Sequence, residues 1–379
     1  MPLTAEELKA HFLLDPEVTF LNHGSYGACP KPVFEQWQRW QADMERQPID
    51  FIARRLQGLL DQARVDLGAY VGAPADDLTF VTNTSAGINI IAKSIELQPG
   101  DEILGTNLEY GALDWTWQHH TAKHGASYIR QPITLPVTTP EALVDELWQG
   151  VTPRTKAIFV SHITSATALK LPVELICQRA KAEGILTIVD GAHAPGQIPV
   201  DITAIGADIY AGNCHKWLCA PKGAAFLYVH PDLQKWVEST IISWGWYPGS
   251  TFISRNQMQG THDASPWLTV PTAIAWQAEH EWNAVRSRCH DLLREYVVAL
   301  HDQFGTESIY SNDSWYTQLA AITLPAGDYT NLKERLLARG IEIPVTEHLD
   351  RTFVRISVQG YVTQKDLVHL SDVLRDELQ

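Results

Sequence analysis

A lysine and an aspartate follow two apolar stretches in the middle of the chain. Asp190 comes directly after the run 185–189, and Lys216 lies shortly after a second, largely apolar run at 207–211. Such runs are typical of strands that are buried on both faces of a sheet. α/β sheets bind ligands at the carboxyl ends of neighbouring strands. An amine and a carboxylate at that edge suit pyridoxal phosphate, which needs a Schiff-base lysine and an anion beside its pyridinium nitrogen.

A turn rich in hydroxyl side chains offers a seat for a phosphate group. Asn83-Thr84-Ser85-Ala86-Gly87 follows a predicted strand at 77–81 and opens a helix that runs to about Ile95. Backbone N–H groups at a helix N-terminus are free to bind an anion. Simple capping of the helix by Thr84 or Ser85 is the alternative. Because the sequence also contains the lysine–acid pair that pyridoxal phosphate needs, we interpret this turn as the site of the cofactor's phosphate.

Strands and helices alternate in the central region, which indicates parallel βαβ units throughout. Strands are expected at 77–81, 101–106, 127–131, 156–164, 185–189, 207–211 and 224–229, and helices at 83–95, 113–122, 140–149 and 172–183. Before this region, helices are expected at 4–14, 32–47 and 51–71, with a short strand at 18–21. After it, a helical stretch at 270–303 precedes strands at 318–324, 341–345 and 352–358 and helices at 329–338 and 363–377.

These patterns predict an N-terminal segment (1–17) that packs with a small C-terminal α/β domain (269–379), and a large domain (18–268) between them.

Composition indicates a globular enzyme. The chain has 379 residues, of which 45% are hydrophobic and 19% charged, and its net charge is −15. An acidic chain without basic runs argues against nucleic acid or an anionic membrane as a partner. The 5 cysteines are scattered without a C-x-x-C pair, which fits a reducing compartment. With no secretory signal or apolar run of membrane-spanning length, we expect a cytoplasmic location.

Other kinds of site are poorly supported. His120 and His124 are spaced for one helix face, with His119 beside them, but without a nearby Glu or a third spaced ligand they are interpreted as a solvated face. We therefore expect no metal. A nicotinamide-dependent oxidoreductase would need a strand–GxGxxG–helix, and the sequence has none.

Several longer motifs occur in a fixed order along nearly the whole chain. They are LNHGSYGACP (21–30), VTNTSAGIN (81–89), SHITSATALKLPV (161–173), VDGAHAPGQ (189–197), QGTHDASPWLTVP (259–271) and VRISVQGY (354–361). Together they resemble the class V aminotransferase family of fold type I pyridoxal phosphate enzymes, with the isopenicillin N epimerase-like branch as the nearest likeness. The resemblance implies a large domain with a mainly parallel seven-stranded sheet flanked by helices, plus a smaller C-terminal α/β domain. It also implies a homodimer in which Thr261 reaches the neighbouring subunit's cofactor phosphate.

The resemblance assigns roles to particular residues. Lys216 would form the Schiff base and later move the Cα proton, while Asp190 would pair with the pyridinium nitrogen. The other cofactor-binding residues would be Thr84, Ser85, Ala86, Tyr110, Ser165, His193, His215 and Thr261. Arg355 would clamp the substrate's α-carboxylate, with the loop Asn22, His23 and Gly24 at the edge of the site. The alternatives are a capping role for Asp190, a core tyrosine at Tyr110 and an exposed edge-strand charge at Arg355.

The implied reaction acts at the α-carbon of a small amino acid or its derivative. Isopenicillin N epimerase-like chemistry is the leading hypothesis. A C–S lyase acting on a cysteine conjugate, an aminotransferase and a non-enzymatic scaffold follow in that order. Desulfuration by a persulfide relay is disfavoured, because relatives of that kind carry a cysteine shortly before the C-terminal arginine. Here the segment is PVTEHLDR (344–351), and no cysteine follows Cys289.

Overall fold

The computed structural model describes residues 3–378, and seven strands in it form one sheet. Across the sheet they are β2 (Leu78–Val81), β8 (Ala225–Val229), β7 (Ile209–Asn213), β6 (Leu186–Gly191), β5 (Thr155–Ser161), β3 (Glu102–Thr106) and β4 (Ser127–Gln131). β8 is antiparallel to both of its neighbours, whereas the pairs from β7 to β4 are parallel. The predicted mainly parallel sheet of seven strands is confirmed.

The prediction of parallel units throughout is wrong at β8. Residues 214–224, which join β7 to β8, contain no helix. A parallel pair needs a long crossover connection, usually a helix, so this short link returns the chain antiparallel.

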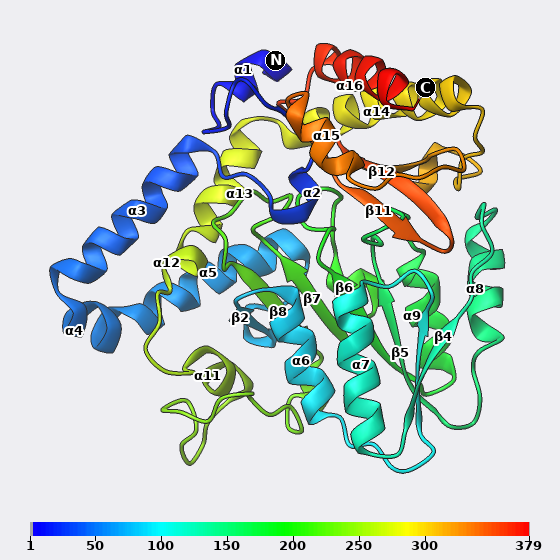
Figure 1. The fold of residues 1–379 in the computed structure, drawn as a ribbon. Helices are drawn as coiled ribbons and strands as arrows, with labels where there is room; N and C mark the ends of the chain where they lie inside the picture. Colours follow the sequence, from blue (N-terminus) through cyan, green and yellow to red (C-terminus); the bar gives the residue numbers. More distant parts are fainter. Residues whose placement is uncertain (1–2, 379) are drawn as a thin grey trace.

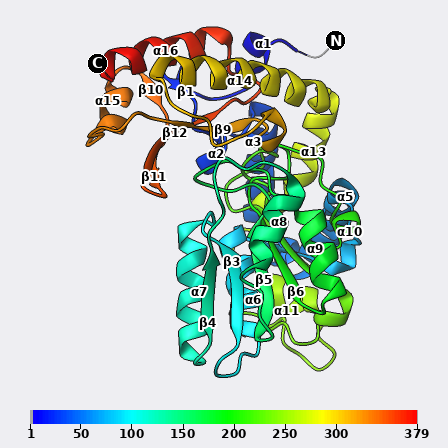
Figure 2. The ribbon, with the colours of Figure 1, turned by 90° about the vertical axis from the view of Figure 1, so that its right-hand side faces the viewer.

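Helices cover both faces of the sheet. α6 (Thr84–Ser94) and α7 (Gly111–Lys123) lie on one face and α9 (Val173–Ala182) on the other (Figures 1 and 2). In β7, Ile209 belongs to one buried apolar cluster and Tyr210 to another, as expected for a strand covered on both sides. The other α-helices of this part are α2 (His23–Tyr26), α3 (Lys31–Arg46), α4 (Pro48–Asp50), α5 (Leu56–Val71), α8 (Pro140–Trp148), α10 (Ile202–Ile205), α11 (Phe252–Gln257) and α12 (Ser265–Leu268), with a π-helical turn at Phe51–Arg55.

A second group of elements lies above the large sheet in Figure 1. Its antiparallel sheet has the order β11 (Val345–His348), β12 (Arg351–Ser357), β9 (Leu319–Thr323). Its helices are α13 (Val270–Glu279), α14 (Trp282–Phe304), α15 (Leu332–Ala338) and α16 (Gln364–Glu377). The N-terminal strand β1 (Thr19–Phe20) pairs with β10 (Ile341–Glu342) of this group, and α1 (Ala5–Lys9) precedes it. The boundaries at 17/18 and 268/269 stay a prediction.

Several predicted elements are shorter or divided in the structure. The helical stretch 270–303 is interrupted at Glu281, whose φ is 50°, a left-handed conformation that ends a helix. The strand predicted at 341–345 is divided between β10 and β11 at Pro344, since proline has no N–H to donate to a ladder. The N-terminal helix keeps its predicted capping box but ends at Lys9 rather than near Leu14.

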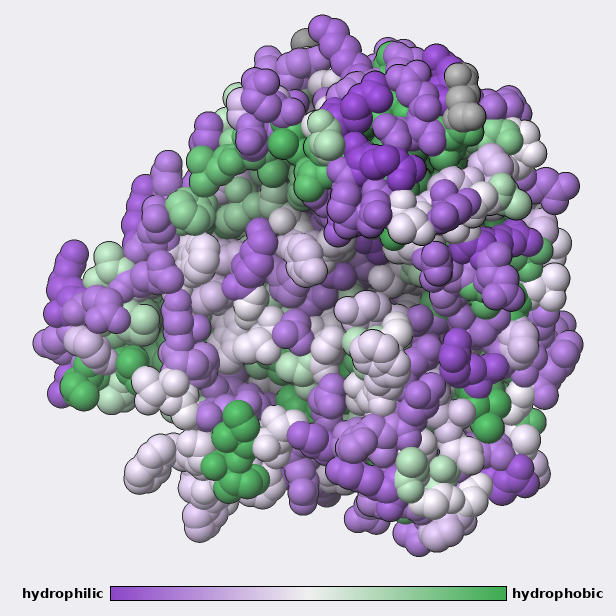
Figure 3. Space-filling model, in the orientation of Figure 1, coloured by the Kyte–Doolittle hydropathy of each residue, from purple (hydrophilic) through white to green (hydrophobic). Residues whose placement is uncertain are grey.

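The segment between β8 and α11 exposes apolar side chains. Ile242 is 67% exposed and Trp244 89%. This segment forms the loops at the lower left of Figure 1, and green hydrophobic residues gather there in Figure 3. Exposed apolar residues that cluster in this way mark surfaces that other molecules cover.

Within residues 3–378, no helix has both the length and the apolar character needed to span a membrane.

Candidate active site

A cavity of about 390 Å³ opens beyond the carboxyl ends of the central strands. The residues that follow β2, β5, β6 and β7 line it. Among them are eight of the residues that the sequence predicted for the site: Thr84, Ser85, Tyr110, Ser165, Asp190, His193, His215 and Lys216. Sequence positions that are more than 100 residues apart therefore meet in one place.

Asp190 lies in β6, and Lys216 follows the end of the adjacent strand β7. Nζ of Lys216 lies 3.1 Å from Nε2 of His193. The pKa of Lys216 is lowered, first by burial of its amine and then by Arg355, with Asp190 opposing the shift. The uncharged amine, which is the nucleophilic and basic form, is therefore accessible near neutral pH.

Asp190 is 4% exposed, and its Oδ1 accepts a hydrogen bond from the Ala192 N–H at 2.8 Å. Burial raises its pKa, while that hydrogen bond and Lys216 act to lower it. The hydrogen bond resembles a local cap, but Asp190 also lines the cavity, where a cation beside it would favour its ionised form.

The predicted phosphate seat lies at the start of α6. The side chain that caps this helix is Asn83, whose Oδ1 accepts from the Ala86 N–H, so the alternative of capping by Thr84 or Ser85 is wrong. The Thr84 hydroxyl is buried without a hydrogen-bond partner in the described part of the chain. Burying an unpaired hydroxyl costs free energy, and a ligand oxygen in the cavity would satisfy it. This orphaned group fits a bound phosphate.

His215 lies beside this seat and lines the cavity. Its Nδ1 is 3.0 Å from the Ala224 carbonyl oxygen, so Nδ1 carries a hydrogen. In the neutral ring Nε2 is then an acceptor, and His215 can donate to a phosphate only when it is protonated. Burial lowers its pKa to about 4 in the ligand-free chain, whereas a phosphate dianion beside the ring would favour the protonated form.

Tyr110 stands directly before α7 and is 45% exposed at the cavity. The alternative of a buried core tyrosine is therefore wrong.

Glu109, which precedes Tyr110, was not predicted as part of the site. This buried carboxylate accepts hydrogen bonds from the Ser161 N–H and hydroxyl and from the Thr106 hydroxyl, and burial raises its pKa to about 7. Glu109 thus ties the turn that carries Tyr110 to the end of β5.

Arg355 lies in β12, the central strand of the smaller sheet, and is 5% exposed, so the alternative of an exposed edge-strand charge is wrong. Its Nη1 donates to the Ser165 carbonyl at 2.6 Å and its Nη2 to the Ser25 hydroxyl at 3.0 Å. Nε has no hydrogen-bond partner, and no carboxylate within residues 3–378 pairs with this guanidinium. A buried cation without a counter-ion is unstable, so the site suits an anionic ligand.

The predicted loop at residues 22–24 is instead the start of a short helix, α2 (His23–Tyr26), with Asn22 directly before it, and none of these three residues lines the cavity. Asn22 donates to Glu342, the Gly24 N–H donates to the Ser357 hydroxyl, and Nε2 of the buried His23 is 3.0 Å from the Lys216 carbonyl oxygen. The next two residues, Ser25 and Tyr26, line the cavity instead. A substrate-binding role for residues 22–24 stays a prediction.

Two predicted cofactor residues do not line this cavity. Ala86 and Thr261 line a neighbouring cavity of about 380 Å³, which shares Thr82 and Gly223 with the first. Within a single chain Thr261 therefore does not complete the site, and its predicted role toward a second subunit stays a prediction.

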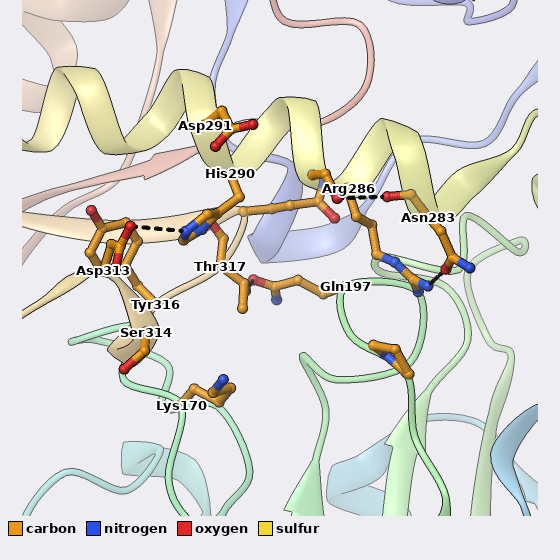
Figure 4. Close-up of a pocket in the computed structure, with 13 residues that line it drawn as sticks. Lys170, Gln197, Asn283, Arg286, His290, Asp291, Asp313, Ser314, Tyr316 and Thr317 are labelled. Carbon is orange, nitrogen blue, oxygen red and sulfur yellow. Dashed lines mark hydrogen bonds and ion pairs between the residues drawn. The ribbon is translucent and has the colours of Figure 1, made fainter. Parts of the chain in front are cut away.

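A larger open groove of about 650 Å³ lies elsewhere, under α14 (Figure 4). It is lined by Lys170, Arg286 and His290 together with Asp291 and Asp313, and His290 is 3.8 Å from Asp313. None of the residues that the sequence predicted for the site lies there.

Known proteins are similar to this chain in both sequence and fold. The family model described as Aminotransferase class-V matches residues 30–370. An isopenicillin N epimerase from Amycolatopsis lactamdurans is 36% identical, with 96% of each chain covered. A putative L-cysteine desulfhydrase 2 from Oryza sativa subsp. japonica is 29% identical over 80% of this chain and 67% of its own length. A cysteine desulfurase structure from Escherichia coli superposes with a TM-score of 0.82 at 21% identity, covering 99% of this chain and 98% of that one.

Proposed function

Because the chain belongs to the class V aminotransferase family, we propose that it is an epimerase that inverts the α-carbon of an amino acid or amino-acid derivative. That it is a pyridoxal phosphate enzyme follows from the family. The observation that carries the proposal is that one cavity brings together the Lys216 amine and the Asp190 carboxylate. Arg355 is not among the residues that line this cavity, but it donates hydrogen bonds to Ser25 and Ser165, which do line it, and it lowers the pKa of Lys216. An amine, a carboxylate and a carboxylate-binding cation are what Cα chemistry on an amino acid requires.

When bound, pyridoxal phosphate supplies an aldehyde for an amine and a ring that withdraws electrons from Cα. Lys216 would hold it, with Asp190 keeping a proton on the ring nitrogen and Thr84, Ser85 and protonated His215 binding the phosphate. Tyr110 would lie against the ring and exclude water.

Two residues would act on the substrate. Arg355 would orient the α-carboxylate with two parallel hydrogen bonds. Nζ of Lys216, once freed by the substrate amine, would take the Cα proton as a general base. Return of a proton to the opposite face of Cα inverts the centre. Removal of the Cα proton by Lys216 would also begin a transamination, or a β-elimination if a group leaves from Cβ.

A C–S lyase is the second candidate. The putative L-cysteine desulfhydrase among the relatives supports it. A persulfide relay would need a cysteine near Arg355, and residues 344–351 contain none.

For either reaction we also propose a homodimer, in which Thr261 of one subunit reaches the cofactor phosphate of the other. A cytoplasmic location remains part of the proposal.

An amino-acid panel separates the candidates. The holoenzyme is incubated in D₂O with isopenicillin N, L-cysteine and common amino acids, and the products are followed by ¹H NMR and chiral chromatography. We expect loss of the Cα–H signal together with racemisation. Pyruvate with ammonia would instead establish elimination, and a cofactor converted to its amine form would establish transamination. If none of these appears with any compound, Cα chemistry on this panel is ruled out.

Thr84→Val is expected to weaken cofactor binding about 10- to 100-fold. A hydrogen bond to a charged group contributes about 1.5–3 kcal/mol, and valine cannot make it. The measurement is a titration of cofactor-free protein with pyridoxal phosphate, read by absorbance. Thr323→Val is the matched control, since its hydroxyl is also buried without a partner but lies in β9, away from the cavity. Equal dissociation constants for Thr84→Val and the wild type would remove Thr84 from the phosphate site.

A further inference from the structure

Trp217, which directly follows Lys216, contacts the imidazole of His193. Trp217 is fully buried, and its Nε1 lies 3.3 Å from Nδ1 of His193. On the other side of the imidazole ring, Nε2 lies 3.1 Å from Nζ of Lys216. The ring of His193 therefore stands between the indole and the amine, with one nitrogen toward each.

The chemistry of indole decides which nitrogen of His193 carries the hydrogen. Indole Nε1–H can only donate, so the imidazole nitrogen that faces it must accept. His193 is 3% exposed, and its pKa is lowered well below the usual value by burial and then by Lys216, Arg355 and His215, so the ring is neutral. A neutral imidazole has one N–H. With Nδ1 accepting from Trp217, that N–H is at Nε2 and points to the Lys216 amine.

We propose that Trp217 is a positioning residue, which fixes His193 as the Nε2–H tautomer and so makes this imidazole a hydrogen-bond donor to the Lys216 amine. An ammonium has no lone pair and cannot accept that hydrogen bond, whereas a neutral amine can. The contact at 3.1 Å therefore favours the uncharged amine, the form that attacks a carbonyl or takes a proton. The same N–H is available to an oxygen of a bound cofactor.

Charged groups around Lys216 and His193 also shift the pKa values of these two side chains. Arg355 lowers the pKa of Lys216 in the same direction as the His193 N–H, and Asp190 raises it. His215 faces His193 and adds to the lowering of its pKa. Without the indole N–H, His193 could turn its lone pair toward Lys216 and stabilise the ammonium. Removal of that N–H is thus expected to raise the pKa of Lys216.

The backbone holds Trp217 firmly in this position. Its carbonyl oxygen accepts a hydrogen bond from Nε2 of Gln277 at 2.8 Å, and a Cβ at Gly196 would meet that carbonyl at 2.3 Å. The Gln197 side chain donates to the His193 carbonyl at 2.8 Å. The backbones of both residues are therefore anchored by contacts other than the one between their rings, and the indole also packs against the ring of His23, with 5.1 Å between the ring centroids.

The test removes the N–H and keeps the ring. Two full-length variants are compared with the wild type: Trp217→Phe, and a chain that carries benzothienylalanine at position 217. Benzothienylalanine has the shape of tryptophan but no N–H, so it keeps the test valid if the phenylalanine variant folds poorly. With ¹⁵N-labelled histidine and a His193→Gln spectrum for assignment, NMR of the cofactor-free protein reports the tautomer. We expect a single Nε2–H form in the wild type and a mixture of tautomers in both variants.

The second readout is the pH dependence of Lys216 modification by an arylating reagent, followed by peptide mass spectrometry. Both variants are expected to move this profile up by about one pH unit, which is a tenfold loss of neutral amine below the pKa. Trp276→Phe is the control, because Trp276 is equally buried and its N–H has no partner in the described structure. In a His193→Gln background, Trp217→Phe should have no further effect on the profile.

An unchanged tautomer, an unmoved profile, or a shift that persists without His193 would each overturn the proposal. The inference uses the proposed role of Lys216, but the tautomer is measured without turnover. Failure of the tautomer test therefore leaves the proposed reaction standing, and failure of the reaction leaves the tautomer result unchanged.

Discussion

Lys216→Ala is expected to lower turnover by about 10⁴-fold and to abolish covalent attachment of the cofactor. The variant lacks the amine that we propose condenses with the cofactor aldehyde, and this amine is also the proposed base for the Cα proton. Positioned proton transfer alone typically contributes about 10²- to 10⁴-fold, and both functions disappear with one side chain. Lys222 also lines the cavity, but Nζ of Lys216 is the amine that lies 3.1 Å from Nε2 of His193, so we expect no other described lysine to replace it. Steady-state kinetics and the visible spectrum after dialysis measure the two effects.

The control for this variant is Lys170→Ala. Lys170 lines the open groove of Figure 4 and not the cavity with Lys216, so its loss should leave turnover and colour unchanged. If Lys216→Ala kept its colour through dialysis and turned over within tenfold of the wild type, Lys216 would not be the attachment site.

Arg355→Met is expected to reduce kcat/KM for amino-acid substrates by about 10²- to 10³-fold, mainly through KM. Removing one partner of a buried, hydrogen-bonded charge pair typically costs 2–5 kcal/mol. Covalent attachment of the cofactor should be retained, because among the described residues Arg355 makes no hydrogen bond to Lys216 or to the predicted phosphate-binding residues Thr84 and Ser85; its side-chain partners are Ser165 and Ser25. Arg355→Lys should recover only part of the loss, since an ammonium lacks the planar, two-pronged geometry of a guanidinium.

Substrate chemistry provides a sharper control for this prediction. If Arg355 binds the α-carboxylate, the wild type and Arg355→Met should act equally poorly on a substrate whose carboxylate is amidated. Arg351→Met, at the exposed start of the same strand, should behave as the wild type with both substrates. A loss of the same size with the amidated substrate would mean that Arg355 supports the fold of the site and does not bind the carboxylate.

Local sequence patterns located the centre of the site because the relevant residues follow strands that are easy to recognise. The apolar runs before Asp190 and Lys216 are buried in adjacent strands, and parallel topology brings their ends together. Arg355 stood out as a charge between Val354 and Ile356, but its partners Ser25 and Ser165 lie in segments far away in the sequence. Only the fold brings those three segments to one point.

Other features depended on contacts that periodicity does not encode. The direction of β8 followed from the absence of a crossover helix, which the alternating pattern did not reveal. Glu109 could have been suspected as an acid just after an apolar strand, but its hydrogen bonds to Ser161 require β3 and β5 to pair. The contact between Trp217 and His193 joins residues 24 positions apart, and no spacing rule predicts it.

The most direct test of the account is to trap the cofactor on the chain. Purified holoenzyme is reduced with borohydride and digested, and the pyridoxyl-modified peptide is identified by mass spectrometry. The account predicts one modified peptide, with the label on Lys216 next to Trp217. A label on any other lysine, or a coloured protein that carries no label after reduction, would contradict it.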